Sequence, residues 1–341
     1  MGALSELARH VRLLCGPLET QVVRIDGALR SSQRALQARY CGTGASLPFL
    51  CKLLFADCRQ QLLRIDHLPA LSNGRAFTDL DRRRADITII ERPPAWQLLS
   101  FGAADISVPA WVQQVIELPA ASGDGGPALP RLLMREVARH ERRSGFALDY
   151  TDDPAAKREF FHRLYEPYVA QRFGEGAVRV SEAFFLHRAR DQELARLRCN
   201  GEWIAGVLLH RHELTLRFGW FGALPGPTVP GASEVLDALI IERAAREGVK
   251  TVQFGNSRPS LEDGVVRYKR RFGAKVRAAR FPQAMINLYV HQWSPPLAQR
   301  LNDAQLIGTR RSAPFVHRIV ERDGRFSVEH APLAAAEATA Q

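Results

Sequence analysis

The stretch that decides the fold runs from residue 233 to residue 257 and reads SEVLDALIIERAAREGVKTVQFGNS. Its first part carries apolar residues at helical spacing, with a serine that can cap the start and Gly248 that can end the helix. Its second part, TVQFGNS, has the alternating pattern that is typical of a strand. A helix that leads directly into a strand predicts a unit in which helices pack on a sheet.

The residues on either side extend this unit. Residues 146–192 predict a strand and two helices, and three strands are predicted between 194 and 223. Asn200-Gly201 is a strong signal for a hairpin turn between the first two of these strands. After the deciding stretch we predict a helix over 263–273 and two strands over 275–282 and 285–291. Strands that can pair antiparallel, joined by a helix to a further strand, indicate the α+β class with a mixed sheet.

The length of the chain indicates more than one domain. It has 341 residues, of which 46% are hydrophobic and 24% charged, as in an ordinary globular protein. A single hydrophobic core rarely extends over more than about 250 to 300 residues, so two domains are predicted. The segment AASGDGGPALP (120–130) is rich in Gly and Pro and is the predicted linker. Residues 1–75 show mixed helical periodicity and leave the first domain weakly defined. The predicted parts are a first domain over 1–128, a connecting helix over 129–145, a second domain over 146–325 and a flexible tail over 326–341.

Charge and cysteine content narrow the possible partners. The formal net charge is +11, and the segment 250–325 alone holds 15 Lys and Arg against 5 Asp and Glu. Such a segment favours an anionic partner, which is nucleic acid, a phosphorylated cofactor or an acidic lipid. Five cysteines without a C-x-x-C pair predict reduced thiols and no metal site. No apolar run reaches the roughly 18 residues of a membrane span, so we expect a cytoplasmic protein without stable membrane insertion.

Two common enzyme classes are excluded by missing motifs. The sequence has no Gly-x-Ser-x-Gly elbow, which argues against a serine hydrolase, and no Walker loop, which argues against an ATPase.

Three segments resemble one family. YEPYVAQRFG (165–174), the stretch 233–257 and above all GVVRYKRRFGA (264–274) resemble the FemAB type of the GNAT acyltransferase superfamily, over about residues 146–290. The resemblance implies two tandem GNAT-like units, each with a mixed central sheet flanked by helices, of which the first is degenerate. It also implies a bacterial enzyme that transfers an acyl or aminoacyl group to an amine by direct attack, without a covalent enzyme intermediate.

The same resemblance implies the substrates. The donor is acyl-CoA or aminoacyl-tRNA, bound as a co-substrate, and no tightly held cofactor is expected. The acceptor is a small-molecule amine or an amine of a cell-envelope precursor, and the protein is a monomer or a homodimer. No long coiled-coil arm of the kind that contacts tRNA is visible in the sequence, which slightly favours a thioester donor.

The donor's phosphates need an anion site. The loop LPGPTVPGA (224–232) leads into the predicted helix, whose free N–H groups and positive dipole end can bind phosphate. An ordinary loop connection is the alternative. The residues predicted to bind the donor are those of the loop and helix start, together with a basic surface on the next helix: Gly226, Gly231, Ala232, Ser233, Arg267, Arg270 and Arg271.

The reacting groups come from the same segments. The resemblance implies that Lys269 stabilises the oxyanion at the reacting carbonyl and that Arg172 binds the acceptor. The other predicted site residues are Tyr268 and Asn256 near the chemistry, and Tyr168, Ser257 and Trp220 at the substrates. A second class of function stays open, in which a catalytically inactive GNAT-like protein binds nucleic acid through its basic segment.

Overall fold

The computed structural model describes residues 19–30, 32–67, 85–94, 102–119, 128–173, 180–226, 229–278, 283–310 and 313–335. The chain divides into two compact units. The first comprises Met1–Val112, Ser257–Arg267 and Arg277–Gln341, and the second comprises Gln113–Asn256 and Tyr268–Val276. Among the described helices, none combines the length and the apolar composition that a membrane crossing requires.

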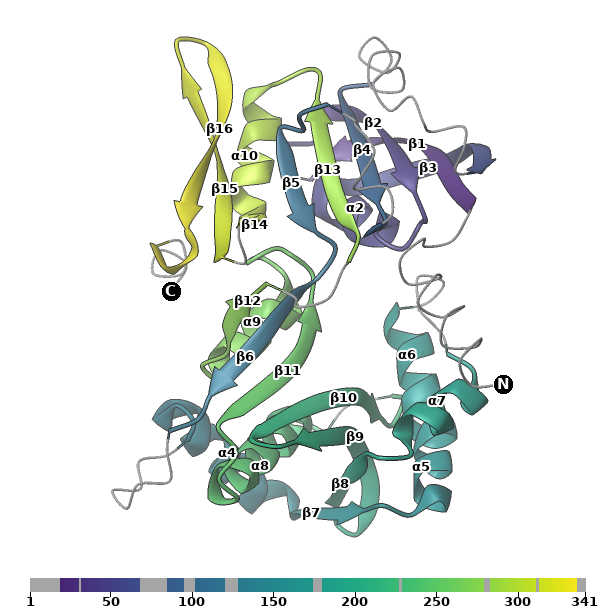
Figure 1. The fold of residues 1–341 in the computed structure, drawn as a ribbon, viewed down its shortest axis with the longest axis vertical. Helices are drawn as coiled ribbons and strands as arrows, with labels where there is room; N and C mark the ends of the chain where they lie inside the picture. The colour runs from purple at the N-terminus through teal and green to yellow at the C-terminus, as the bar shows by residue number, and fades with distance from the viewer. Residues whose placement is uncertain are drawn as a thin grey trace. The chain divides into compact units, whose positions relative to one another are not determined.

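The first unit is built on a six-stranded sheet with the order β3-β1-β2-β4-β13-β5 (Figure 1). Its strands are β1 (Glu19–Leu29), β2 (Ala35–Gly42), β3 (Phe55–His67), β4 (Ile87–Arg92), β5 (Ile106–Pro109) and β13 (Met285–Val290). β2 and β4 pair in parallel, whereas β4 with β13 and β13 with β5 pair antiparallel, so the sheet is mixed. The helices α2 (Leu47–Leu54) and α10 (Pro295–Ala304) share one apolar core with this sheet.

A buried carboxylate ties β4 to β2 and to the start of α2. Glu91 is 2% exposed and accepts hydrogen bonds from the Tyr40 hydroxyl, from Thr43 at 3.2 Å and from the Ser46 hydroxyl at 3.0 Å. Burial, followed by the Glu91 charge, raises the pKa of Tyr40 well above its ordinary value. Tyr40 therefore stays protonated and donates its hydrogen bond. The three hydrogen bonds offset the free-energy cost of burying the Glu91 carboxylate.

The second unit is built on a seven-stranded sheet with the order β12-β6-β11-β10-β9-β8-β7. Its strands are β6 (Val112–Glu117), β7 (Phe146–Thr151), β8 (Glu193–Cys199), β9 (Glu202–His212), β10 (Thr215–Ala223), β11 (Thr251–Ser257) and β12 (Lys275–Arg277). The pairs from β7 to β10 are antiparallel, and β10 with β11 is parallel. The predicted α+β class with mixed sheets flanked by helices is confirmed.

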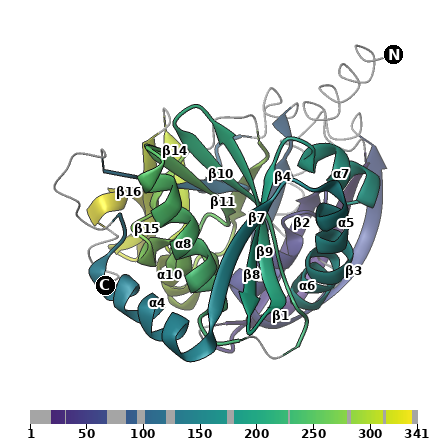
Figure 2. The same ribbon diagram turned by 90° about the horizontal axis from the view of Figure 1, so that it is seen from below.

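Helices cover both faces of this second sheet (Figure 2). One face packs against α4 (Arg131–Ser144) and α8 (Ala232–Arg246). The other packs against α5 (Pro154–Phe160), a π-helical turn η3 (Phe161–Tyr165), α6 (Glu166–Phe173) and α7 (Glu182–Ala189). Successive side chains of a strand point to opposite faces of the sheet and so contribute to both cores. In β9, Val207 and Leu209 belong to the core on the α4 and α8 side, and Leu208 belongs to the core on the other side.

Three predictions about the domain layout and the first elements are wrong. The boundary does not fall in the linker 120–130, because β6 joins the sheet of the second unit. Residues 283–325 do not belong to the second domain, because β13 pairs with β4 and β5 of the first unit. Much of 19–67 is strand, although the sequence shows helical periodicity there. Residues 1–18 and 68–84 lie outside the described residues.

The predicted flexible tail also begins with regular structure. β14 (Ile307–Arg310), β15 (Ala313–Arg322) and β16 (Arg325–Pro332) form a three-stranded sheet, in which β16 pairs with β15 over eight residue pairs. Residues 336–341 lie outside the described residues.

The π-helical turn is packed tightly on β10 at one glycine. A Cβ atom on Gly222 would lie 2.7 Å from the backbone nitrogen of Tyr165 and 2.8 Å from the carbonyl carbon of Leu164. Because backbone atoms of a helix cannot rotate away as a side chain does, only glycine fits this position without displacing the helix.

Gly222→Ala is therefore expected to lower the free energy of unfolding by about 1–3 kcal/mol through overpacking. Gly264→Ala is the matched control, since nothing lies within 4 Å of its Cβ position and it sits at the start of helix α9 (Gly264–Arg271), where alanine is favoured. Urea denaturation of both variants checks the prediction, and an equal effect of the two changes would contradict it.

Candidate functional site

The central feature of the second unit is the separation of two parallel strands. β10 and β11 pair only from Thr215 with Thr251 to Arg217 with Gln253, although β10 continues to Ala223 and β11 to Ser257. A register break in β10 between Phe218 and Phe221 accompanies the separation. The two strands thus diverge toward their carboxyl ends (Figure 1), where open sheets bind ligands.

Lys269 of α9 lies at the end of β11. Its side chain is buried, and its ammonium donates a hydrogen bond of 3.0 Å to the backbone carbonyl of Asn256. The same ammonium lies 5.8 Å from the centroid of the Phe254 ring, an arrangement that favours a cation. Lys269 is thus directed at the strand end and not at bulk solvent.

A buried carboxylic acid lies beside this lysine. Asp237 of α8 is 5% exposed and accepts a hydrogen bond of 2.7 Å from the Tyr268 hydroxyl. Burial raises the pKa of Asp237 to about 7, although the bond from Tyr268 and the positive charge of Lys269 act to lower it. Burial, with the Asp237 charge, also raises the pKa of Tyr268 far above the usual range of a phenol, so Tyr268 remains protonated.

Two residues of α6 approach the same group. Arg172 donates a hydrogen bond of 2.9 Å to the Tyr168 hydroxyl, with its guanidinium 5.6 Å from the centroid of that ring. Burial raises the pKa of Tyr168, and the negative charge of Asp237 raises it further, while Arg172 lowers it. Asp237 therefore bonds one of the two predicted tyrosines, Tyr268, and its charge acts on the other, Tyr168.

Two amide groups at the start of α8 have no hydrogen-bond partner among the residues that the structure describes. Gly231 is the cap residue in the left-handed conformation at φ 81°, and a Cβ there would lie 2.3 Å from the His140 ring, so glycine is required. Ala232 donates to the Val229 carbonyl, and the amides of Ser233 and Glu234 occupy the next helical positions, which have no partner within a helix. Two N–H groups and the helix dipole are thus available to an anion.

A comparison with known protein families identifies this fold. Residues 123–270 match the family described as an acetyltransferase (GNAT) domain. The chain contains a GNAT acyltransferase domain. The resemblance stated for residues 146–290 is thereby confirmed at the level of the superfamily, and the matched range begins and ends earlier than the sequence analysis expected.

Solved structures with a similar course of the chain include three enzymes or enzyme domains that carry a functional name. The C-terminal domain (DUF2156) assigned to a lysylphosphatidylglycerol synthetase of Agrobacterium fabrum has 16% identity and a TM-score of 0.39, covering 86% of this chain and 88% of that chain. L-PGS from Bacillus licheniformis has 12% identity and a TM-score of 0.39, covering 84% and 90%. FemX has 11% identity and a TM-score of 0.40, covering 81% and 85%. These scores are too low to support an argument about substrate or reaction. No curated protein sequence matches the chain significantly.

The GNAT domain brings together part of the predicted site. Lys269, Tyr268 and Asn256 lie at the end of β11, and Tyr168 bonds Arg172 on α6, where the charge of Asp237 acts on it. The predicted glycines of the donor loop are also in left-handed conformations, at φ 105° for Gly226 and 81° for Gly231.

Several predicted residues have other surroundings. Arg271 forms ion pairs with Glu136 at 2.5 Å and Glu234 at 3.4 Å, so its charge is already neutralised and not free for phosphate. Arg270 is half-buried and already has an interaction, whereas Arg267 is exposed and, like the buried Ser257, belongs to the first unit. Trp220 stacks on Phe185 with ring centroids 4.8 Å apart, inside an aromatic core cluster, and so serves packing.

Two residues of the site were missed by sequence reasoning. Asp237 interrupts the apolar run LDALII, and an acidic residue on a face that is otherwise buried was a usable signal. His140 carried no such signal, because its contact with Gly231 depends on how α4 packs against α8.

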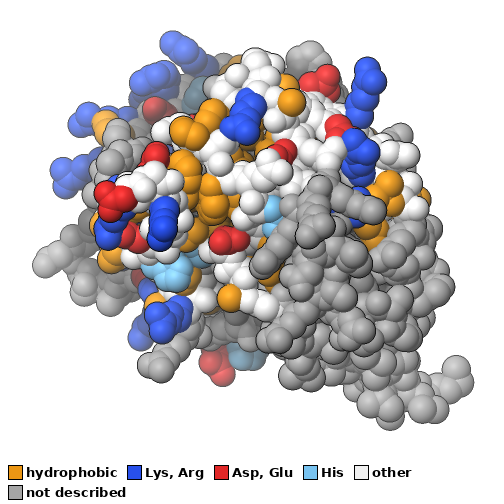
Figure 3. Space-filling model, turned by 90° about the horizontal axis from the view of Figure 1, so that it is seen from above, with side chains coloured by type: hydrophobic (Ala, Val, Ile, Leu, Met, Phe, Trp, Pro, Cys, Tyr) orange, Lys and Arg blue, Asp and Glu red, His pale blue; other side chains and the backbone are white. Residues whose placement is uncertain are grey.

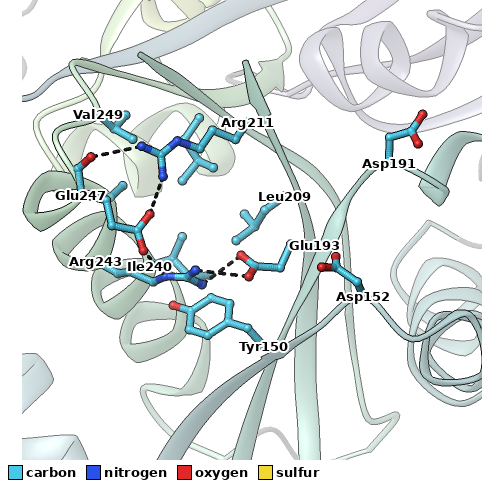
Figure 4. A pocket seen from close by; sticks show the side chains of 12 residues that line it. Tyr150, Asp152, Asp191, Glu193, Leu209, Arg211, Ile240, Arg243, Glu247 and Val249 are labelled. Atoms are coloured by element: carbon cyan, nitrogen blue, oxygen red, sulfur yellow. Dashed lines mark hydrogen bonds and ion pairs between the residues drawn. The ribbon is translucent and has the colours of Figure 1, made fainter. Parts of the chain in front are cut away.

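A cavity of about 300 Å³ in the same domain lies apart from these residues (Figure 4). Its charged groups largely neutralise one another, because Arg243 bonds Glu193 at 2.9 Å and Glu247 at 2.6 Å, and Arg211 bonds Glu247 at 2.6 Å. The Arg243 guanidinium also stacks 3.7 Å from the centroid of the Tyr150 ring. We interpret this cavity as a surface depression lined by an ionic network, and the network holds α8 to the sheet.

The raised pKa of Asp237 predicts a defined pH dependence of stability. The folded protein binds the Asp237 proton more tightly than the unfolded chain, so the stabilisation is complete below the unfolded pKa of 3.8 and is lost as the pH rises to about 7. Asp237→Asn keeps an acceptor for Tyr268 but does not titrate. Its stability should therefore rise relative to wild type between about pH 4 and 7, as measured by urea denaturation at several pH values. A constant difference over this interval would contradict the buried, protonated state.

Proposed function

We propose that the chain is a FemAB-type N-acyltransferase in which an acceptor amine directly attacks the carbonyl carbon of an acyl-CoA thioester. In this reaction the C–N bond forms, the C–S bond breaks, and the negative charge passes through the carbonyl oxygen to the leaving thiolate. The amine loses one proton, and the CoA thiol gains one. The protein therefore has to hold the donor's phosphates, stabilise the oxyanion and place the amine.

Lys269 is proposed to stabilise the oxyanion. Its ammonium lies where β10 and β11 diverge, and this position is the observation that carries the proposal. An ammonium has three N–H donors, and the bond of one of them to the Asn256 carbonyl orients the group at the end of β11. Placed in buried surroundings, such a donor stabilises developing charge far more than it would in water.

The donor's phosphates are proposed to bind at the start of α8. The amides of Ser233 and Glu234 and the adjoining Gly231 form the anion site, and the family match is to a domain described by acetyl transfer, which supports a CoA thioester over aminoacyl-tRNA. The Glu234 carboxylate lies in the same turn, and its ion pair with Arg271 reduces the repulsion that a phosphate would meet. Arg271 is thus assigned an indirect role.

The acceptor is proposed to bind beside Arg172 and Tyr168. A guanidinium held against a tyrosine ring is oriented, and it suits an acceptor that carries a carboxylate or phosphate besides its amine. Asp237 acts through Tyr268, since its carboxyl accepts the phenol's hydrogen bond and thereby orients that hydroxyl. Asp237 is a positioning residue in this scheme.

Binding of the donor is tested first by thermal stability. CoA and acyl-CoA are expected to raise the melting temperature, because a ligand at about 100 times its Kd adds about 2.7 kcal/mol to the stability of the folded state. Deacylated tRNA is the second arm. A shift with tRNA and none with CoA would replace the thioester donor by aminoacyl-tRNA, and no shift with either would contradict the proposed function.

Lys269→Ala is expected to lower kcat by about 100- to 1,000-fold with intact folding, because one oxyanion donor is lost. Lys275→Ala on β12 is the matched control, since that lysine is exposed, and its kcat should stay at the wild-type value. Steady-state kinetics with acyl-CoA measure both. Turnover of Lys269→Ala within about threefold of wild type would show that the assigned role is wrong.

A further inference from the structure

Helix α4 presents one continuous cationic face to solvent. Five of its fourteen residues are exposed arginines. They are Arg131, Arg135, Arg139, Arg142 and Arg143. At about 100° per residue, all five project within an arc of about 120°. Leu133 and Val137 project on the opposite side and are buried in the core against α8 and the sheet. The orientation of the arginines is therefore fixed by the packing of the helix.

The arginines of this face have no counter-charge. None of the five makes a hydrogen bond or an ion pair with any residue that the structure describes. The acidic residues of α4, Glu136 and Glu141, project outside the arc, and Glu136 is paired with Arg271. Some other arginines of the same unit are paired, as Arg196 and Arg198 are with Asp149. What distinguishes α4 is that five exposed arginines without a partner among the described residues project within one arc.

One apolar side chain lies among the five guanidinium groups. Leu132 is 74% exposed, the highest value among the exposed large hydrophobic residues, and it projects within the same arc. An exposed leucine between cations costs free energy in water and is explained by a partner that has both negative charge and an apolar interior.

We propose that the exposed face of α4 docks the protein on the surface of a membrane that contains anionic phospholipids. The face is about 18 Å long, because twelve steps of about 1.5 Å separate Arg131 from Arg143. Guanidinium groups bind phosphate oxygens with two parallel hydrogen bonds, and Leu132 would enter the boundary between headgroups and acyl chains. In this arrangement the protein lies on the bilayer, and only one side chain enters it.

A nucleic acid is the competing partner for a row of arginines. Single-stranded nucleic acids are usually held by stacking on aromatic rings, and α4 has no Phe, Tyr or Trp. The exposed leucine has no role on a phosphate backbone. On the face of the molecule shown in Figure 3, Lys and Arg side chains lie among acidic, apolar and polar ones, so cations are not gathered in a comparable way there.

The experiment is sedimentation of the full chain with vesicles of phosphatidylcholine alone or mixed with phosphatidylserine. The wild-type protein should bind only the mixed vesicles and should be released by salt. Arg135→Gln with Arg139→Gln is expected to weaken this binding by roughly 30-fold, from the contribution of each arginine near an anionic surface. Both side chains are exposed and have no hydrogen bond or ion pair among the described residues, so the fold should be retained.

A matched control removes the same charge elsewhere. Arg188→Gln with Arg246→Gln changes two exposed arginines of α7 and α8. This variant should leave vesicle binding within about twofold of wild type, because neither arginine lies on the α4 face that is proposed to contact lipid. Lys269→Ala should also bind vesicles normally, which separates this inference from the proposed function. Absence of binding to the mixed vesicles, or equal weakening by both double variants, would overturn the proposal.

An RNA duplex is the second arm of the experiment. Leu132→Gln should weaken binding to mixed vesicles and leave any binding to the duplex unchanged, because only the bilayer offers an apolar interior. If Leu132→Gln left vesicle binding unchanged, or if the α4 arginines were needed for the duplex and not for vesicles, the membrane would be the wrong partner.

Discussion

The separation of β10 from β11 is the constraint on which the site depends. Three parallel residue pairs hold the strands together, and the register break after Phe218 turns β10 away. Gly222 fixes β10 against the backbone of the π-helical turn, and Lys269 bonds the Asn256 carbonyl near the end of β11. Packing on one strand and a charged hydrogen bond on the other thus hold the two strand ends where their pairing has stopped.

The same packing sets the electrostatics of the site. Asp237 lies on the face of α8 that covers the sheet, and burial leaves it a carboxyl group with a pKa of about 7. Its neighbours Tyr268 and Lys269 come from the last turn of α9, directly before the buried Phe272, so one element places the phenol toward α8 and the ammonium toward β11. Adjacent residues on a helix point about 100° apart, which allows this division. The cost of burying these groups is offset by their mutual interactions.

The elements of the second unit could be predicted from local sequence patterns. Elements that depend on pairing between distant strands could not. The turn at Asn200-Gly201 and the apolar spacing of α8 are properties of neighbouring residues, and both were predicted correctly. β2 shows alternating burial, yet its segment also fitted a helical spacing, and only its pairing with β1 decides between them. Likewise, the pairing of β13 with β4 joins residues about 200 positions apart. In the site, the motif around Lys269 could be recognised in the sequence. The role of Asp237 could not, because it depends on the hydrogen bond from Tyr268, which lies in a different segment.

The central claim is that a donor binds between the start of α8 and the end of β11. Hydrogen–deuterium exchange with and without CoA tests it most directly, because it reports where amides become protected. The account predicts protection over residues 231–236 and 254–257 on addition of CoA. Protection confined to other segments, such as those around Glu193 and Glu247 at the cavity, or no protection at saturating CoA, would contradict it.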